Sequence, residues 1–150
     1  MTIEHFFIDG VRLEAELTST SDSTSKLNVL SVPRPYSIEW LNPDIPIETL
    51  INEDPNAILF ADSYIAETWL TNIADHVPSF FVKALETEKN VFTAIDFAEF
   101  MESIGTTKGN MVYVVGGGIM QDLGAFSCAM YKRGIPWTYI PTTLLGMTDS

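Results

Sequence analysis

Residues 111–126 read MVYVVGGGIMQDLGAF, and this stretch decides the fold class. Its first five residues are uncharged and apolar, which is typical of a strand buried on both faces. Three glycines follow at once, and a helical pattern comes next, for which we expect a buried stripe made of Ile119, Leu123, Phe126 and Met130. Glycines at such a junction let a ligand approach the backbone, and the first amides of the helix favour an anion. The stretch predicts a strand, turn and helix that bind a phosphate group.

The same alternation of short apolar runs and amphipathic runs surrounds this stretch. Strands are predicted at 57–61, 80–82, 111–115 and 137–140. Asp62 or Ser63 can cap the helix that follows the first strand. A helix near residues 91–101 is expected to bury Val91, Ala94, Ile95, Ala98 and Met101. Gly105 and Gly134 are placed to end the second and third helices. Strands that alternate with helices predict a doubly wound, Rossmann-like parallel α/β sheet over residues 57–150.

The first 56 residues have a different pattern of apolar and polar residues. Apolar residues alternate with charged ones on both sides of Asp9-Gly10, which predicts a β-hairpin. The polar run 18–26 is interpreted as a loop or short linker, and extended segments broken by Pro33 and Pro35 follow it. We expect residues 1–56 to be a β-rich segment that joins the sheet.

Composition excludes several classes of protein. Eight basic residues against twenty acidic ones give a net charge of 8 − 20 = −12, which disfavours nucleic acid as a partner. One cysteine, Cys128, cannot form an internal disulfide and suits a reducing compartment. His5 and His76 lie far apart and form no zinc motif. No apolar run is long enough for a membrane span and no secretory leader is visible, so the expected location is cytoplasmic.

The glycine cluster alone is a weak motif. The dinucleotide pattern G-x-G-x-x-G is incomplete, because Gln121 stands where the third glycine should be, and no Walker lysine follows. Three glycines can also make a plain tight turn. Asp122 either complements the helix dipole or receives a hydroxyl or amide of a ligand. The adjacent Thr142 and Thr143 follow the next strand, where they would form a second edge of the same crevice.

Several short motifs occur together, with fixed spacings, over the last 35 residues of the sequence, and their combination resembles a known family. Gly-Gly-Gly, an Asp four residues later, an Arg-Gly at the helix end and Pro-Thr-Thr-Leu-Leu followed by Asp occur in this order over residues 116–150. This pattern resembles the dehydroquinate synthase family of sugar phosphate cyclases. Weaker similarity extends back to about Ala57.

The resemblance implies roles for particular residues. Gly117, Gly118 and Ile119 would hold the NAD pyrophosphate, and Asp122 would contact the nicotinamide half. The rest of the cofactor cleft would be lined by Thr142, Thr143 and Leu145, with Asp62 at the end of an earlier strand. Glu86 and Lys89 match residues that hold the adenosine ribose, although they can also be a solvated ion pair. Arg133 and Asp149 match positions that contact the sugar phosphate, although Arg133 can also simply cap a helix.

Some features of the family are missing. Ala84-Leu85 replaces a usual Pro-Gly, Tyr64 replaces a common asparagine, and Gln121 replaces a glycine, so a relative that acts on another sugar phosphate is possible on sequence grounds. The family binds a divalent metal, Zn or Co, through a helical C-terminal domain. We expect these 150 residues to lack that domain and its ligands, and to be the N-terminal half of an enzyme that does not catalyse alone. The resemblance also implies a homodimer.

The implied reaction is an NAD-dependent cyclisation. An alcohol of a sugar phosphate is oxidised, phosphate is eliminated, hydride returns, and an aldol step closes a carbocycle. An iron-type alcohol or glycerol dehydrogenase is an alternative, although Ile119 stands where those enzymes often have serine. A non-catalytic NAD-binding module is a further alternative if the chain is complete.

Overall fold

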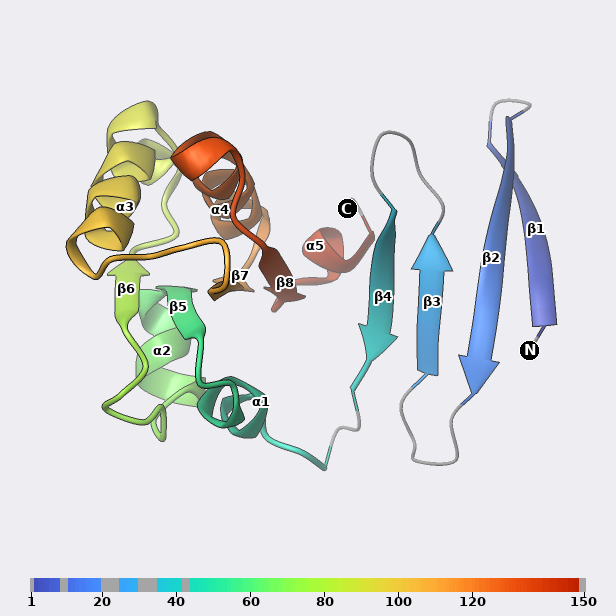
Figure 1. Cartoon of the computed structure of the whole chain (residues 1–150), viewed down its shortest axis with the longest axis horizontal. Coiled ribbons are helices and arrows are strands. Elements are labelled where there is room, and N and C mark those ends of the chain that lie inside the picture. Colours follow the sequence, from blue (N-terminus) through green and yellow to red (C-terminus); the bar gives the residue numbers. More distant parts are fainter. Residues whose placement is uncertain (1, 9–10, 20–24, 30–34, 42–43, 149–150) are drawn as a thin grey trace. The chain divides into compact units, whose positions relative to one another are not determined.

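A computed structural model of the chain describes residues 2–8, 11–19, 25–29, 35–41 and 44–148. The chain divides into two compact units, Met1–Pro46 and Ile47–Ser150. Each unit contains one four-stranded sheet (Figure 1).

The first unit is an antiparallel sheet in the order β1-β2-β3-β4. Its strands are β1 (Thr2–Ile8), β2 (Val11–Ser19), β3 (Ser25–Val29) and β4 (Tyr36–Trp40). Ile8 pairs with Val11, which confirms the predicted hairpin, while its turn residues Asp9 and Gly10 lie outside the described residues. Pro33 also lies outside them.

One expectation for this unit needs correction. The loop predicted at 18–26 is shorter, because Thr18 pairs with Lys26 and Ser19 with Ser25. Ladder hydrogen bonds use the backbone, so polar side chains with acceptable strand propensity do not end a strand. That residues 1–56 join the parallel sheet stays a prediction, and the described strands β1 to β4 form a sheet of the first unit.

The second unit confirms the predicted doubly wound parallel sheet. Its strands are β5 (Ala57–Asp62), β6 (Ser79–Val82), β7 (Met111–Gly116) and β8 (Trp137–Pro141). They lie in the order β6-β5-β7-β8 and every neighbouring pair is parallel. The chain passes from β5 to β6 on one side and then across to β7 on the other, so the winding direction reverses between β5 and β7.

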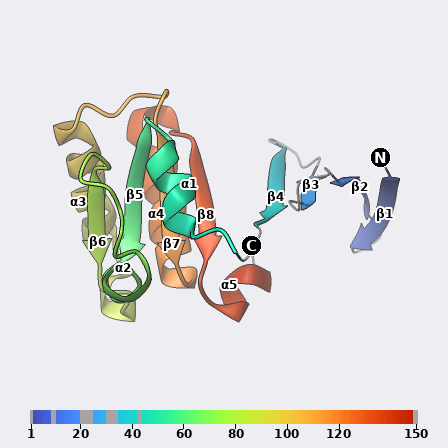
Figure 2. The ribbon, with the colours of Figure 1, turned by 90° about the horizontal axis from the view of Figure 1, so that it is seen from below.

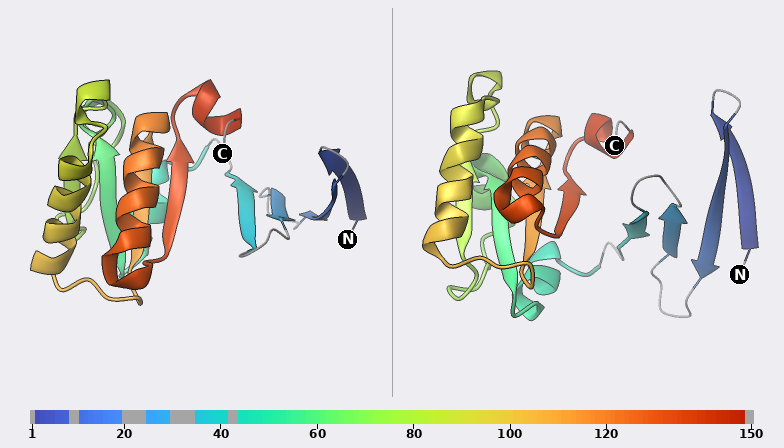
Figure 3. Two further views of the ribbon diagram at one scale, coloured as in Figure 1. Left: turned by 90° about the horizontal axis from the view of Figure 1, so that it is seen from above. Right: turned by 45° about the horizontal axis from the view of Figure 1, so that its top comes forward.

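Helices cover both faces of this sheet. They are α1 (Ile47–Glu53), α2 (Ser63–Trp69), α3 (Val91–Ser103), α4 (Gly118–Met130) and α5 (Leu144–Thr148), with short 3-10 turns η1 (Glu86–Glu88) and η2 (Tyr131–Arg133). Figures 2 and 3 show α1 and α2 on one side of the sheet and α3 and α4 on the other. Ile51 of α1 packs with Leu59 and Val115, and Phe97 of α3 packs with Phe60 on the opposite face.

The buried stripe of α3 is rotated from its expected position. Ala94 and Met101 are buried as expected, but Val91 is 50% exposed and Ile95 is 38% exposed. Phe97 takes their place, because its ring stacks on Phe60 with centroids 4.1 Å apart. Gly105 ends the helix as predicted: its φ is 70° and its amide donates to the Glu102 carbonyl at 3.0 Å.

The stripe of α4 is also only partly as expected. Leu123 is buried and Ile119 is half-buried, whereas Phe126 and Met130 are exposed. The buried face instead contains Met120, Leu123, Gly124, Ser127 and Cys128. Gly124 explains this orientation, because the absent side chain lets α4 lie directly against Val114 of β7. Within the described part of the chain, no helix has both the length and the apolar composition of a bilayer crossing.

Candidate functional site

The carboxyl ends of β5 and β7 meet where the winding reverses. Ala61 pairs with Val115, so the next residues along, Asp62 and Gly116, lie side by side. A methyl group on Gly116 would lie 3.5 Å from the Asp62 Cβ. In open α/β sheets, ligands bind in the crevice at this reversal point. The three glycines therefore stand where the fold provides a binding crevice.

Gly116 must be glycine for two reasons. Its φ is 154°, and a Cβ there would lie 2.8 Å from the Met120 Cβ and closer still to the Met120 Cγ. The absence of a side chain lets β7 turn directly into α4. The first turn of α4 is thereby brought up to the carboxyl edge of the sheet.

The start of α4 presents free hydrogen-bond donors, and we call Gly117, Gly118 and Ile119 the glycine corner. The Gly117 carbonyl accepts from the amides of Met120 at 3.0 Å and Gln121 at 3.1 Å. The amides of Gly118 and Ile119 have no acceptor among the described residues. A methyl group on Gly118 would meet no described atom within 4 Å. Two donors at the positive end of a helix thus lack a partner, with open space beside Gly118, and such donors suit a phosphate.

The segment after β8 is hydrogen-bonded to this corner. The Gly116 carbonyl accepts from the Thr142 amide at 2.9 Å and from the Tyr139 hydroxyl at 3.1 Å. A Cβ on Gly117 would lie 3.1 Å from the Thr143 methyl. The structure therefore brings both threonines to the glycine corner. Burial, followed by the nearby Asp122 carboxylate, raises the pKa of Tyr139, so this hydroxyl keeps its proton and donates.

Asp122 is ion-paired with Lys89 from the segment between η1 and α3. The Lys89 Nζ lies 2.5 Å from the Asp122 Oδ2, and this hydrogen bond raises the pKa of Lys89. The expected Glu86–Lys89 pair is replaced by this one, and Glu86 is exposed on η1. A groove of about 210 Å³ runs beside the pair and is lined by Lys89, Asn90, Val91, Ala94, Asp122, Leu123 and Phe126.

Asp62 has a structural function in addition to its place in the crevice. Its Oδ1 accepts from the Tyr64 amide at 3.2 Å and caps α2 as predicted. The same oxygen accepts from the Ala84 amide at 3.4 Å. One carboxylate oxygen therefore ties the segment after β6 to the end of β5.

The predicted site residues after α4 differ in where the structure places them. Arg133 lies in η2, beyond the far end of α4, and the 13 residues of α4 span about 20 Å. Leu145 is 70% exposed on α5. Asp149 lies outside the described residues. Lys132 and Arg133 both have positive φ, so α4 does not extend through them as the sequence pattern suggested.

Sequence reasoning missed Tyr139 and Gly146. A Cβ on Gly146 would collide with the Tyr139 hydroxyl oxygen, so this glycine leaves the space that the tyrosine fills. The available signal was the position of Tyr139, an aromatic hydroxyl two residues before the end of a strand whose carboxyl end lines the crevice.

Neither a metal centre nor a reactive thiol is present among the described residues. Residues 2–8, 11–19, 25–29, 35–41 and 44–148 contain no group of three or more His, Cys, Asp or Glu side chains suited to a metal ion. Burial raises the pKa of the Cys128 thiol to about 12. A thiol that stays protonated at neutral pH is a packing residue.

Sequence comparisons match the part of the chain that carries this site. Residues 79–150 match the family model described as 3-dehydroquinate synthase N-terminal. A 3-dehydroquinate synthase of Prochlorococcus marinus is 34% identical over 91 residues, which cover 59% of this chain and 25% of that protein. One from Xylella fastidiosa is 28% identical over 133 residues, which cover 81% of this chain and 36% of that protein. The chain thus spans about a quarter to a third of the relatives it matches.

Solved structures with a similar fold are also enzymes that act as synthases. A 2-epi-5-epi-valiolone synthase from Streptomyces hygroscopicus subsp. jinggangensis, with NAD⁺ and Zn²⁺ bound, has a TM-score of 0.56 and 25% identity. The similarity covers 63% of this chain and 29% of that one. A 2-deoxy-scyllo-inosose synthase complexed with carbaglucose-6-phosphate, NAD⁺ and Co²⁺ has a TM-score of 0.61 and covers 90% of this chain and 37% of that one. At 18% identity, the second similarity concerns the fold alone.

Proposed function

Because residues 79–150 match the family model described as 3-dehydroquinate synthase N-terminal, we propose that this chain is the cofactor-binding part of an NAD-dependent sugar phosphate cyclase. The observation that carries the proposal is the pair of free amides on Gly118 and Ile119. They lie at the point where the sheet reverses its winding direction, with open space beside Gly118. A diphosphate group is the part of NAD that fits such donors.

The residues at the glycine corner fit NAD. Gly117, Gly118 and Ile119 would hold its diphosphate, since the amides of Gly118 and Ile119 are unpaired and the space beside Gly118 is open. Asp122 would contact the nicotinamide half. The other cofactor contacts in the proposal are Asp62, Glu86, Lys89, Thr142, Thr143 and Leu145. Bound NAD would supply a hydride acceptor that later returns the hydride.

The chain's own side chains would organise this site. Tyr139 and Thr142 fix the Gly116 carbonyl, so the turn into α4 keeps one conformation. Lys89 neutralises Asp122 beside the groove, which lowers the repulsion between that carboxylate and an incoming diphosphate. Fixed donors are more effective than mobile ones because little ordering is needed on binding.

Binding of a divalent metal is proposed for the complete protein and not for the residues that the structure describes. The described residues contain no suitable group of ligands, so no step of the reaction is assigned to a metal here. Arg133 and Asp149 stay predictions as substrate contacts. The substrate class is a sugar phosphate. A homodimer and a cytoplasmic location are also part of the proposal, the latter supported by the single buried cysteine.

Incubation of the complete protein with NAD and seven-carbon keto-sugar phosphates tests the proposal. We expect release of inorganic phosphate with no net formation of NADH, because the hydride returns to the substrate. Steady accumulation of NADH would instead indicate a dehydrogenase. Binding of NAD without any turnover would indicate a nucleotide-binding module.

A further inference from the structure

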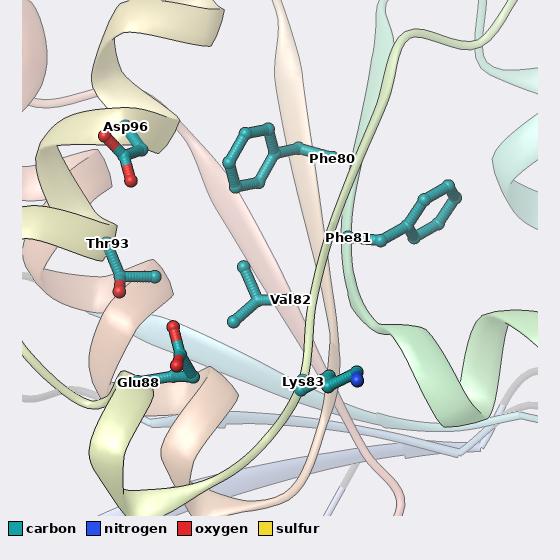
Figure 4. A pocket seen from close by; sticks show the side chains of 7 residues that line it. All are labelled: Phe80, Phe81, Val82, Lys83, Glu88, Thr93 and Asp96. Atoms are coloured by element: carbon teal, nitrogen blue, oxygen red, sulfur yellow. The ribbon is translucent and has the colours of Figure 1, made fainter.

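A second cavity lies at the outer edge of the parallel sheet. It has a volume of about 350 Å³ and lies between the edge strand β6 and helix α3 (Figure 4). Its lining residues are Phe80, Phe81, Val82, Lys83, Glu88, Thr93 and Asp96. None of the residues assigned to NAD lines it. The cavity is therefore available to a different ligand.

The charged groups of this cavity favour a cation. Glu88 and Asp96 each contribute a carboxylate, and neither has an ion-pair partner among the described residues. Figure 4 shows Lys83 extending away from the side on which both carboxylates lie. Two carboxylates and one ammonium, whose side chain points away from them, leave the lining with a net negative charge in a chain whose net charge is already −12.

Thr93 provides an independent indication of a ligand. Its side chain extends from α3 toward β6 and lines the cavity (Figure 4), yet the residue is only 7% exposed. Its amide donates to the Asn90 side chain at 3.1 Å, but its hydroxyl has no hydrogen-bond partner among the described residues. The buried side-chain oxygen without a partner among the described residues is the Thr106 Oγ1, so the Thr93 hydroxyl is open to the cavity and free to bond a ligand there.

We propose that this cavity binds an alkylammonium group. The ammonium has three donors, and the cavity offers three kinds of acceptor: the Glu88 carboxylate, the Asp96 carboxylate and the Thr93 hydroxyl. Phe80 and Val82 supply an apolar wall for the alkyl stem, and the Phe80 ring can also attract the cation. A metal ion is disfavoured, because the described residues contain no group of three metal-ligating side chains.

Two sources can present such a group. One is a free small amine. The other is a lysine side chain on an extended segment that pairs with β6, which is an edge strand within the described sheet. Both place the same ammonium on the same acceptors, so the ligand chemistry is shared.

Saturation-transfer NMR on the complete protein tests the proposal with n-butylammonium as the probe, and with 1-butanol and butyrate as neutral and anionic controls. We expect transfer to n-butylammonium, little to butanol and none to butyrate. Asp96→Asn and Glu88→Gln should each weaken binding about three-fold. Glu99→Gln, on the same helix but outside the cavity, is the matched control and should change nothing.

Thr93→Val separates a binding role from a structural one. It removes only the unpartnered hydroxyl, so the melting temperature should stay equal or rise while n-butylammonium binds more weakly. Equal transfer to butanol and butylammonium, or binding unaffected by all three substitutions, would overturn the proposal. The affinity for NAD should stay unchanged in these variants, so failure here is distinguishable from failure of the proposed function.

A second experiment distinguishes a free small amine from a lysine side chain as the natural ligand. An acetylated Thr-Val-Lys-Val-Thr amide peptide is compared with its Lys→Leu counterpart. Tighter binding of the lysine peptide than of n-butylammonium supports a lysine side chain on an added strand. Tighter binding of free n-butylammonium supports a small amine.

Discussion

Helix α4 uses glycine in opposite ways in its first and second turns. At Gly118 a methyl group would meet no described atom within 4 Å, and the neighbouring amides are free. At Gly124 a methyl group would lie 2.6 Å and 2.8 Å from the two Val114 methyls. The same residue type therefore leaves room for a ligand at one position and allows close packing at the other. The comparison separates substitutions that affect binding from those that affect folding.

Gly124→Ala should have the largest effect on stability. The added methyl overlaps both methyls of Val114 in the middle of the sheet, so α4 must move outward. We expect a loss of about 3 kcal/mol in the free energy of unfolding, measured by urea denaturation. The affinity of the remaining folded protein for NAD should be nearly unchanged. Wild-type stability of this variant would show that α4 does not pack as closely as described.

Alkaline pH should weaken the packed half of α4 next. Burial raises the pKa of the Cys128 thiol from 9.0 to about 12. The folded state therefore holds its proton longer than the unfolded state, so stability is complete below pH 9 and falls as the pH rises toward 12. Between pH 8 and pH 10.5 the loss should be about 2 kcal/mol.

Urea denaturation at the two pH values measures this loss, and Cys128→Ala is the control. The variant should show a smaller dependence on pH, whatever its stability at pH 8. The remaining slope is expected from Tyr113, whose pKa burial raises to about 12, with a contribution from its hydrogen bond to Asp54. A stability that does not change between the two pH values would contradict the burial of the thiol.

Gly118→Ala should affect binding and leave folding intact. The methyl enters open space within the first turn, where alanine is a better helix former than glycine. We expect NAD to bind the complete protein about ten-fold more weakly, because its diphosphate loses close contact with the amides. Calorimetric titration measures this change. Unchanged affinity, with normal stability, would place the diphosphate elsewhere.

Lys89→Met should have the smallest effect. The Lys89–Asp122 pair is exposed, so its loss should leave the melting temperature nearly unchanged. The affinity for NAD should fall about three-fold at low salt and less at high salt, since screening already weakens the wild-type pair. Equal loss at both salt concentrations would show that the charge of Lys89 is not what matters. Lys108→Met is the control, because Lys108 lies in the turn after α3.

The fold was predictable where the pattern of apolar residues indicated a single type of secondary structure. Uncharged runs such as 111–115 suit only a strand buried on both faces, and β7 lies there. The buried faces of α3 and α4 were less predictable, because apolar residues surround most of each helix. Choosing between Ile95 and Phe97 required knowing that Phe60 faces α3 with its ring, which is a tertiary contact.

The site was predictable to a similar extent. The glycines, Asp122 and the two threonines follow strand ends, and parallel strands bring their carboxyl ends to one edge. The partner of Lys89 was not predictable, since Glu86 is closer in sequence but Asp122 is closer in space. The position of Arg133 depends on the length of α4, which carries it away from the edge where α4 begins.

Tyr139 and Gly146 share one small volume, and this has a consequence for sequence variation. The phenolic oxygen occupies the space that any side chain at position 146 would need. Substitutions at the two positions are therefore coupled, because a larger residue at 146 requires a smaller one at 139. A smaller residue at 139 removes the hydrogen bond that the Tyr139 hydroxyl donates to the Gly116 carbonyl. Among natural variants of this chain, a tyrosine at 139 should always accompany a glycine at 146.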